Sequence, residues 1–361
     1  MSDILIIGGG IIGMLTAREL ALAGMDVSII EQGEAGHESS WAGGGIISPL
    51  YPWRYPDAVS ALAKWGQAFY PELIEEINTE TGLDAELLQS GLLVLDDEKD
   101  AALVWAEKWQ SNLQVIDNKE IISVEPELSP ALVMHNAIWM PEVRQVRNPR
   151  LVKSVKNYLL KQGVKFIEKT QVTGFLTNDS KVRGVKTSST DIESDKVLLA
   201  GGAWSAKLLQ SLDINIEVEP VKGQMILFNT EPGKIKRITL SQDRYVIPRK
   251  DGRVLVGSTL EHTGFEKTVT TSAREELMAE AFRIIPALEN AKVEHHWAGL
   301  RPGSNNGIPY ICDIKKLDGL YLNTGHFRNG VVLGPASARL AADLILERQT
   351  ILDAAMYDLD R

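Results

Sequence analysis

The chain has 361 residues, of which 44% are hydrophobic and 24% are charged, with 30 glycines and 15 prolines. This length predicts about two domains, and the composition excludes long disordered or collagen-like tracts. The formal net charge of −10 argues against binding to nucleic acid or to an anionic membrane surface. No apolar run approaches the roughly 18 residues of a membrane span, so we expect no membrane partner.

The first 31 residues predict a strand, a helix and a second strand. Ile4 to Ile7 is wholly apolar, as strands buried on both faces of a parallel sheet are. A helix over 12–23 with an apolar stripe follows and ends at Gly24. The chain then returns as a second buried strand over 27–30, which completes a βαβ unit.

A glycine fingerprint lies between the first strand and the helix. Gly8, Gly10 and Gly13 form GxGxxG, and Glu31 follows at the end of the second strand. The glycines allow a tight turn, close approach of a pyrophosphate to backbone N–H groups and close helix packing, and the acid can bind a ribose. FAD and NAD both fit this pattern, whereas the carboxylate of Glu31 disfavours NADP.

The segment 38–49, ESSWAGGGIISP, combines two hydroxyls with three adjacent glycines. The serines can bond phosphate oxygens, and the glycines let the backbone approach a flat ring or a phosphate. An ordinary Ser/Gly loop is the alternative. Residues 48–55 follow with two prolines and several aromatic residues, and they predict either a lid over a substrate or a segment packed against the protein body.

The rest of the chain alternates between helices and two kinds of strand. Residues 196–200 form an apolar run before two glycines, like the first strand. The expected strands over 223–229, 244–249 and 253–259 carry polar residues, and Asp251–Gly252 signals a hairpin between the last two. Further helices are expected over 58–79, 98–109, 149–162, 203–212, 272–285 and 336–346.

Parallel α/β segments and antiparallel strands therefore interleave along the chain. This predicts an α/β protein in which a Rossmann-like dinucleotide-binding domain comprises residues 1–85, 146–218 and 299–361. A mixed antiparallel substrate-binding domain comprises residues 86–145 and 219–298.

Two C-terminal features bear on cofactors. The GHFRNG loop over 325–330 precedes a small-residue helix, and such a loop can present backbone donors to the electron-rich edge of a flavin, although a plain connection is the alternative. The adjacent His295 and His296 point to opposite faces of an expected strand and are poor joint metal ligands. We therefore expect no metal.

The single cysteine, Cys312, excludes an intrachain disulfide and favours a cytoplasmic location.

Six motifs taken together resemble the D-amino-acid oxidase family, and most closely its glycine-oxidising members. They are IIGGGIIGMLTARELALAG, ESSWAGGGIISPLYPWRY, LAGGAWS, YVIPRKDGRVLVGSTLE, WAGLRPG and GHFRNGVVLGPA, in order from residue 3 to about 346. The resemblance implies an FAD-dependent oxidase of glycine or another small amine. Its products would be the imine or 2-oxo acid, ammonia and, from O2, hydrogen peroxide. A role in thiamine thiazole synthesis and a homotetramer are also implied.

The resemblance assigns roles to individual residues. Arg301 in WAGLRPG corresponds to the arginine that holds the substrate carboxylate, a task to which a guanidinium fork is suited. Tyr245 assists it, and Arg328 lies near flavin and substrate. Without the resemblance, Arg301 would be read as a structural ion pair or a surface charge, and Tyr245 as a half-buried packing residue. The expected FAD contacts are Gly8, Gly10, Ile11, Ile12, Gly13, Glu31, Gln32, Ser39, Ser40, Ala42, Gly43, Gly44, Gly45, Val172, Ala200, Gly201, Gly202, Trp204, Arg301, His326, Phe327, Arg328, Asn329, Gly330 and Val331.

Some relatives in the family, the sarcosine oxidases, attach their flavin through a cysteine near a PYI-like strand. Cys312 falls a few residues too late in that pattern, so we expect noncovalent FAD. Two other functions stay open. One keeps the FAD chemistry but changes the substrate to sarcosine or a larger D-amino acid, or avoids O2 as a dehydrogenase. The other is a noncatalytic FAD-binding protein.

Overall fold

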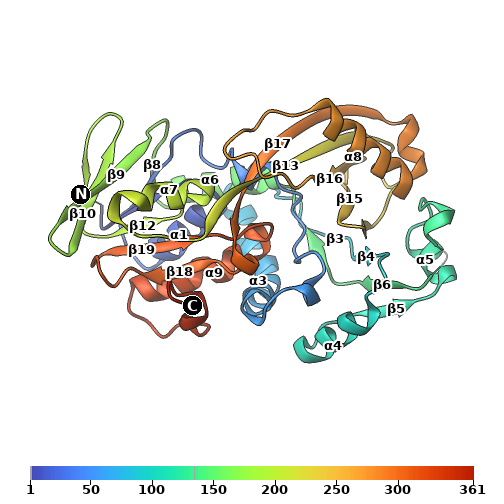
Figure 1. The fold of residues 1–361 in the computed structure, drawn as a ribbon, viewed down its shortest axis with the longest axis horizontal. Helices are drawn as coiled ribbons and strands as arrows, with labels where there is room; N and C mark the ends of the chain where they lie inside the picture. Colours follow the sequence, from blue (N-terminus) through green and yellow to red (C-terminus); the bar gives the residue numbers. More distant parts are fainter. Residues whose placement is uncertain (1, 134) are drawn as a thin grey trace.

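The computed structural model describes residues 2–133 and 135–361, and two large β-sheets organise them (Figure 1). A six-stranded sheet lies mainly in the left half of Figure 1, and an eight-stranded sheet lies mainly in the right half. The helices are α1 (Ile11–Leu22), α2 (Ser39–Ala42), α3 (Asp57–Thr81), α4 (Lys99–Trp109), α5 (Asn118–Val124), α6 (Asn148–Lys161), α7 (Ser205–Leu209), α8 (Thr271–Ile284) and α9 (Gly330–Ile345).

The six-stranded sheet has the order β18-β19-β12-β1-β2-β8, and every neighbouring pair is parallel except β18 with β19. Alternate residues of β1 face opposite layers. Ile4 and Ile6 pack against α1, α3, α6 and α9, whereas Leu5 and Ile7 pack toward a small three-stranded sheet. The strands are β1 (Ile4–Ile7), β2 (Val27–Ile30), β8 (Lys165–Ile167), β12 (Val197–Leu199), β18 (Tyr310–Asp313) and β19 (Leu320–Thr324). The small sheet comprises β9 (Val172–Asn178), β10 (Lys181–Thr187) and β11 (Ile192–Glu193).

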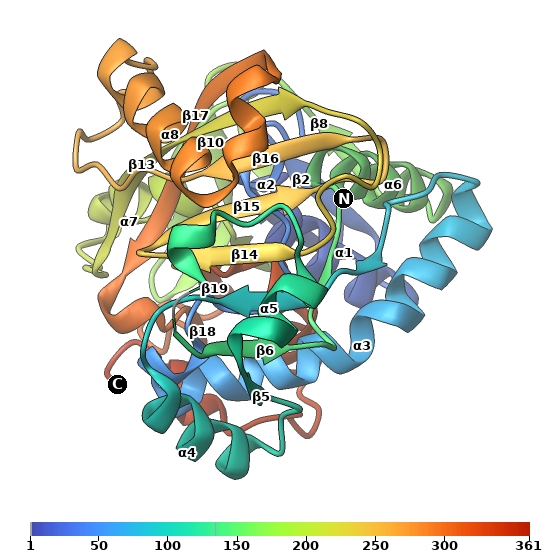
Figure 2. The same ribbon diagram turned by 90° about the vertical axis from the view of Figure 1, so that its right-hand side faces the viewer.

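The eight-stranded sheet has the order β17-β13-β16-β15-β14-β4-β6-β5 and is antiparallel except where β14 runs parallel to β4. Helix α8 packs across one face of this sheet (Figure 2). Its strands are β4 (Leu92–Val94), β5 (Gln114–Ile116), β6 (Ala137–Met140), β13 (Val218–Asn229), β14 (Ile238–Ser241), β15 (Arg244–Pro248), β16 (Arg253–Gly257) and β17 (Lys292–Ser304). A separate short pair joins β3 (Leu88–Gln89) to β7 (Arg144–Gln145).

The chain passes between the two large sheets several times, which agrees with the predicted α/β class of interleaved parallel and antiparallel regions. Long strands β13 and β17 pair along twelve positions and extend toward the six-stranded sheet in Figure 1. The division of the chain into 1–85, 146–218 and 299–361 against 86–145 and 219–298 stays a proposal.

Two expected helices differ in the structure. The helix expected over 203–212 is wrong: only α7 is α-helical there, between tight 3-10 turns at Gly202–Trp204 and Gln210–Leu212, because i→i+3 bonds close both ends of this short segment. Helix α9 begins at Gly330, not at residue 336, so Pro335 lies inside it. Proline cannot donate to Val331 O, and the Tyr70 hydroxyl donates to that carbonyl instead, at 2.7 Å.

Candidate active site

One cavity of about 490 Å³ connects the glycine turn after β1 to a face of the eight-stranded sheet. Gly8, Gly10 and Glu31 line one part of it, and Tyr245 and Arg301 line another. Its volume lies in the range of cofactor and ligand sites in proteins. The residues expected to bind a dinucleotide and those expected to bind a substrate therefore share one cavity.

Of the residues expected to contact FAD, all except Gly13 line this cavity. Gly13 lies behind the turn, where a Cβ would come within 2.0 Å of Gly8 O, so its position serves helix packing. Sequence reasoning missed further lining residues, among them Thr170, Gln171, Gly223, Met225 and Gly299. The last three belong to paired strands β13 and β17, and only the register of those strands reveals them.

The turn after β1 has the form that a diphosphate requires. Gly8 has a φ of 108°, and a Cβ there would lie 2.4 Å from Ala200 O, so only glycine fits. No side chain caps α1 at Gly10, which leaves N–H groups of its first turn available at the cavity. The Ile11 N–H donates to Ser40 Oγ at 2.8 Å. The hydroxyl hydrogen of Ser40 is thereby free to donate to a phosphate oxygen.

Ser39 and Ser40 differ in what they can offer. The Ser39 hydroxyl donates to Leu300 O at 2.8 Å, so its only proton is engaged and it ties α2 to β17. The donor role expected for both serines is thus open to Ser40 alone in this arrangement.

Glu31 is held at the end of β2 by backbone donors. Its two carboxylate oxygens accept the N–H groups of Gly9 at 2.8 Å and Gly33 at 2.9 Å. The residue is 8% exposed and lines the cavity. Each oxygen keeps lone pairs for ribose hydroxyls, so the carboxylate is preorganised for a dinucleotide.

The glycine segment 43–45 is fixed from behind by Arg249. The Nη2 group of Arg249 donates to Gly44 O at 2.8 Å, and the Nη1 group donates to Val146 O at 3.0 Å. Burial lowers the pKa of this guanidinium to about 10. A Cβ at Gly45, which has a φ of 77°, would lie 2.1 Å from Val146 O. The close approach at Gly45 is therefore to the protein's own backbone, whereas the sequence pattern suggested a ring or a phosphate.

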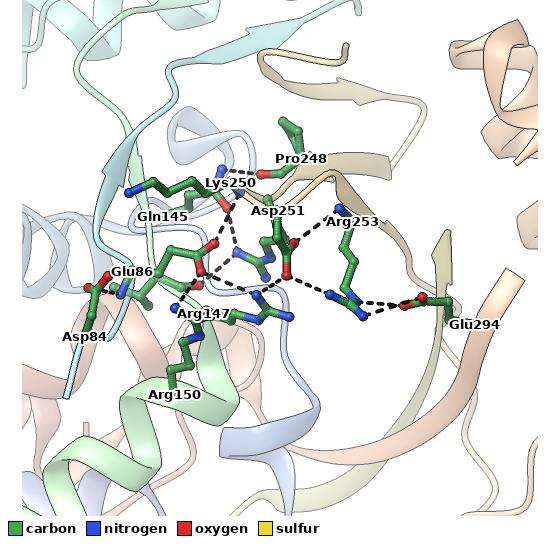
Figure 3. Close-up of polar contacts among 12 residues, drawn as sticks. Asp84, Glu86, Gln145, Arg147, Arg150, Pro248, Lys250, Asp251, Arg253 and Glu294 are labelled. Atoms are coloured by element: carbon green, nitrogen blue, oxygen red, sulfur yellow. Dashed lines mark hydrogen bonds and ion pairs between the residues drawn. The ribbon is translucent and has the colours of Figure 1, made fainter. Parts of the chain in front are cut away.

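A polar network surrounds this support and joins α6 to strands of the eight-stranded sheet (Figure 3). Glu86 pairs with Arg147 at 3.4 Å and with Arg150 at 3.1 Å. Asp251, in the β15–β16 hairpin, lies 2.8 Å from both Arg147 and Arg253. Burial alone would raise the pKa of Asp251, but hydrogen bonds from the two arginines lower it to about 2. The network fixes the hairpin next to the wall of the cavity.

Arg301 presents its guanidinium to the other end of the cavity. Its Nη2 donates to Ser258 Oγ at 2.6 Å and its Nη1 to Thr259 O at 3.2 Å. In the described part of the chain neither Arg301 nor Arg328 forms an ion pair. Burial lowers the pKa of Arg301, Tyr245 opposes that shift, and Arg328 adds to it. The site therefore holds two neighbouring cations suited to an anion.

Tyr245 lies beside Arg301 and is 7% exposed. Its hydroxyl donates to Met225 Sδ at 3.1 Å. A thioether is a weak acceptor, so this hydroxyl can be recruited by a better one.

His326 lies in the GHFRNG loop and is 1% exposed. Its Nε2 is 2.6 Å from Ser337 Oγ, and Ser337 donates its proton to Asn323 Oδ1 at 2.6 Å. Nε2 must therefore carry the hydrogen. Burial lowers the pKa of the imidazole to about 3, so His326 is neutral at physiological pH.

Cys312 lies on β18 and does not line the cavity. It is 4% exposed, and burial raises the pKa of its thiol to about 12. Within residues 2–133 and 135–361, no group of three histidine, cysteine or acidic side chains could hold a metal ion. None of the helices described is long and apolar enough to cross a membrane.

The segment 48–55 is anchored to the protein body. The Tyr51 hydroxyl donates to Asp96 at 2.6 Å, and the Trp53 indole donates to Glu98 at 2.7 Å. Arg54 stacks over the Tyr51 ring at 3.6 Å. The segment therefore packs against the protein body, and its residues Ser48 and Leu50 also line the cavity.

A parallel sheet with a glycine turn of the dinucleotide-binding type, an antiparallel sheet that carries Arg301, and one cavity lined by both are features of nucleotide-dependent oxidoreductases. Residues 3–344 match the family described as FAD dependent oxidoreductase, DAO. The chain belongs to this family, and FAD is its cofactor.

Named relatives match along nearly the whole chain. The glycine oxidase of Pseudomonas aeruginosa is 50% identical over 356 residues, which cover 98% of this chain and 97% of that protein. The crystal structure of glycine oxidase from Geobacillus kaustophilus superposes with a TM-score of 0.94 at 28% identity, covering 100% of this chain and 98% of the other. The bifunctional protein ThiO/ThiG of Trichormus variabilis is 29% identical, over 96% of this chain and 53% of its own length.

Proposed function

We propose that the protein is an FAD-dependent glycine oxidase. Glycine, water and O2 would give glyoxylate, ammonia and hydrogen peroxide, and small amines such as sarcosine or D-alanine would be further substrates. The observation that carries the proposal is the pair of arginines, Arg301 and Arg328, which line the FAD cavity beside Tyr245 and have no carboxylate partner among residues 2–133 and 135–361. The 50% identity to a glycine oxidase over the full length supports the choice of substrate.

In this proposal each residue has its own task. The Arg301 fork binds the substrate carboxylate through two parallel hydrogen bonds, and the Tyr245 hydroxyl donates a further one. Two such points fix the orientation of the substrate Cα in the cavity. Bound FAD supplies the two-electron acceptor for the Cα–H bond. The neutral His326 adds no charge to the cavity at physiological pH.

The cofactor sites follow from the cavity lining. We assign the diphosphate to the turn at Gly8 and Gly10 with the Ser40 hydroxyl, and the adenosine ribose to Glu31. The other predicted contacts that line the cavity would surround the rest of the cofactor. Because Cys312 lies outside the cavity lining with a raised thiol pKa, we propose that FAD binds noncovalently. Yellow flavin that stays in an acid-precipitated protein pellet would contradict this.

The proposal also covers the cellular location, the oligomeric state and the fate of the product. The single, buried cysteine is compatible with a cytoplasmic enzyme. The family resemblance supports a homotetramer and an imine product that enters thiamine thiazole synthesis.

The test is a peroxide assay on FAD-loaded protein with glycine, sarcosine and D-alanine. We expect peroxide to form with glycine at the highest kcat/KM. Flavin reduction by glycine without peroxide would indicate a dehydrogenase. Neither peroxide nor flavin reduction with any of the three amines would contradict the proposal and favour a noncatalytic FAD-binding protein.

A further inference from the structure

One methionine borders the two residues proposed to bind the substrate carboxylate. Met225 on β13 is opposite Gly257 of β16, and Gly257 is opposite Tyr245 of β15. Residues two apart on a strand share a face, so Met225 also shares its face with Gly223, next to the Arg301 guanidinium. Met225 is 2% exposed and lines the cavity with Tyr245 and Arg301.

Two glycines keep this part of the sheet free of other side chains. A Cβ at Gly257 would lie 2.4 Å from Met225 Sδ and 3.0 Å from the Tyr245 hydroxyl. A Cβ at Gly223 would lie 2.1 Å from Arg301 Nη2. The floor of the site is therefore backbone, bordered by Arg301, Tyr245 and Met225.

The contact between Tyr245 and Met225 is one that a substrate can replace. The Tyr245 hydroxyl donates to Met225 Sδ at 3.1 Å, and a thioether sulfur is a weak acceptor. A carboxylate is a much stronger acceptor. A carboxylate bound to Arg301 would therefore draw the hydroxyl proton away from the sulfur.

We propose that Met225 determines substrate size and positions Tyr245. In the free enzyme its sulfur holds the Tyr245 hydroxyl near Arg301, and on binding it yields that hydroxyl to the substrate carboxylate. Its side chain occupies the space beside the substrate Cα that a larger substituent would need. This inference rests on the proposed amino-acid oxidase function and deepens it.

The size role is tested by Met225→Ala, with Met225→Val as a second variant in case alanine lowers the FAD content. Opening the space by more than one methylene should raise the ratio of kcat/KM for D-alanine to that for glycine by about tenfold or more. Met140→Ala is the matched control, because Met140 is 4% exposed in the same apolar cluster and does not line the cavity. An unchanged ratio in FAD-loaded M225A and M225V would overturn the size role.

The hydrogen-bond role is tested by Met225→Leu, which keeps the volume and removes the acceptor. Acetate serves as a carboxylate probe, and its binding is followed through the visible spectrum of bound FAD. Without the competing sulfur, the Kd for acetate should fall about two- to tenfold, as expected for the loss of one net hydrogen bond in the free protein. In a Tyr245→Phe background the same change should have no effect. An equal change in both backgrounds, or none in either, would overturn this role.

The two hypotheses fail separately. Acetate binding requires no turnover. The comparison of Met225→Leu in the unmodified and Tyr245→Phe backgrounds therefore tests the role of Met225 even if the protein oxidises no amine. Absence of amine oxidation by the unmodified protein contradicts the proposed function alone.

Discussion

Arg301 and Arg328 bring two positive charges into one cavity, and the residues described supply no carboxylate to pair with either. Burial and the proximity of Arg328 both lower the pKa of Arg301, so the fold tolerates an arrangement that an anion would relieve. An amino-acid substrate brings that anion. The two neighbouring cations are unfavourable in the free protein, and a bound carboxylate would relieve this repulsion, which would increase its affinity for the site.

Replacing Arg301 with alanine removes both donors of the fork. We expect KM for glycine to rise about 10- to 150-fold, corresponding to the loss of charge-assisted hydrogen bonds worth about 1.5–3 kcal/mol, with little change in FAD content. Arg301→Lys should recover little, because an ammonium cannot bind a carboxylate bidentately. Steady-state kinetics with oxygen-electrode detection measures both, and the surface residue Arg183, changed to alanine, is the control. An unchanged KM would remove Arg301 from the substrate site.

His326 makes a pH-dependent contribution whose sign follows from its burial. The pKa of its imidazole is lowered from 6.5 to about 3 in the folded protein. Between these values the unfolded chain binds a proton that the folded protein excludes. The contribution is therefore complete above pH 6.5 and is lost as pH falls toward 3, by up to about 1.4 kcal/mol per pH unit.

This predicts that His326→Asn flattens the loss of stability on acidification. Urea unfolding of both proteins at pH 6.5 and pH 5 isolates the His326 imidazole, because most carboxylates remain ionised in that interval and the other histidines are common to both proteins. The difference in unfolding free energy between the two pH values should be smaller in the variant. The same difference in both proteins would show that His326 is protonated in the folded state.

At the scale of elements, helix α2 begins with two adjacent serines whose hydroxyl groups form different hydrogen bonds. The Ser39 hydroxyl donates to Leu300 O of β17, whereas Ser40 Oγ accepts from the Ile11 N–H of α1, and we propose that the Ser40 proton is donated to the cofactor. Ser40→Ala should therefore weaken FAD binding about two- to tenfold, the effect of one net hydrogen bond. Ser39→Ala should change FAD affinity less and provides the matched control. Quenching of flavin fluorescence on titration gives both values, and equal weakening by the two variants would contradict the distinction.

The elements also show what local sequence can and cannot predict. The strand-turn-helix at residues 4–13 was predicted correctly, because apolar runs and required glycines are local signals. The start of α9 was not, since the acceptor left free by Pro335 is satisfied by Tyr70 from another helix. Likewise, Ser39 and Ser40 look equivalent in sequence, and only the positions of Leu300 and Ile11 distinguish them.

The same limit applies within the site. Family motifs identified Arg301 and Tyr245 as candidates, and both line the cavity. Met225 carries no motif, because its importance comes from the pairing of β13 with β16 and of β16 with β15. Contacts made through register across three strands are beyond pattern-based prediction from a single sequence.

At the scale of the whole molecule, the interleaved chain connects two sheets whose separate tasks meet in one cavity. The six-stranded sheet supplies the glycine turn and Glu31, and the eight-stranded sheet supplies Tyr245 and Arg301. The network of Glu86, Arg147 and Asp251 joins the start of α6 to the β15–β16 hairpin of the eight-stranded sheet, next to that cavity (Figure 3). Under the proposed function, one cavity shared by the two sheets holds the cofactor and substrate sites in a constant relation to each other, as a reaction between them requires.

The central claim is that this cavity brings FAD and a bound carboxylate together. It is tested most directly by anaerobic titration of the yellow, FAD-loaded protein with glycine, followed by flavin absorbance, beside the Arg301→Ala variant. We predict that glycine bleaches the unmodified protein and that the variant, equally yellow, needs far higher concentrations. A folded protein that takes up no FAD, or a flavin that glycine and other small amines leave unbleached, would contradict the account.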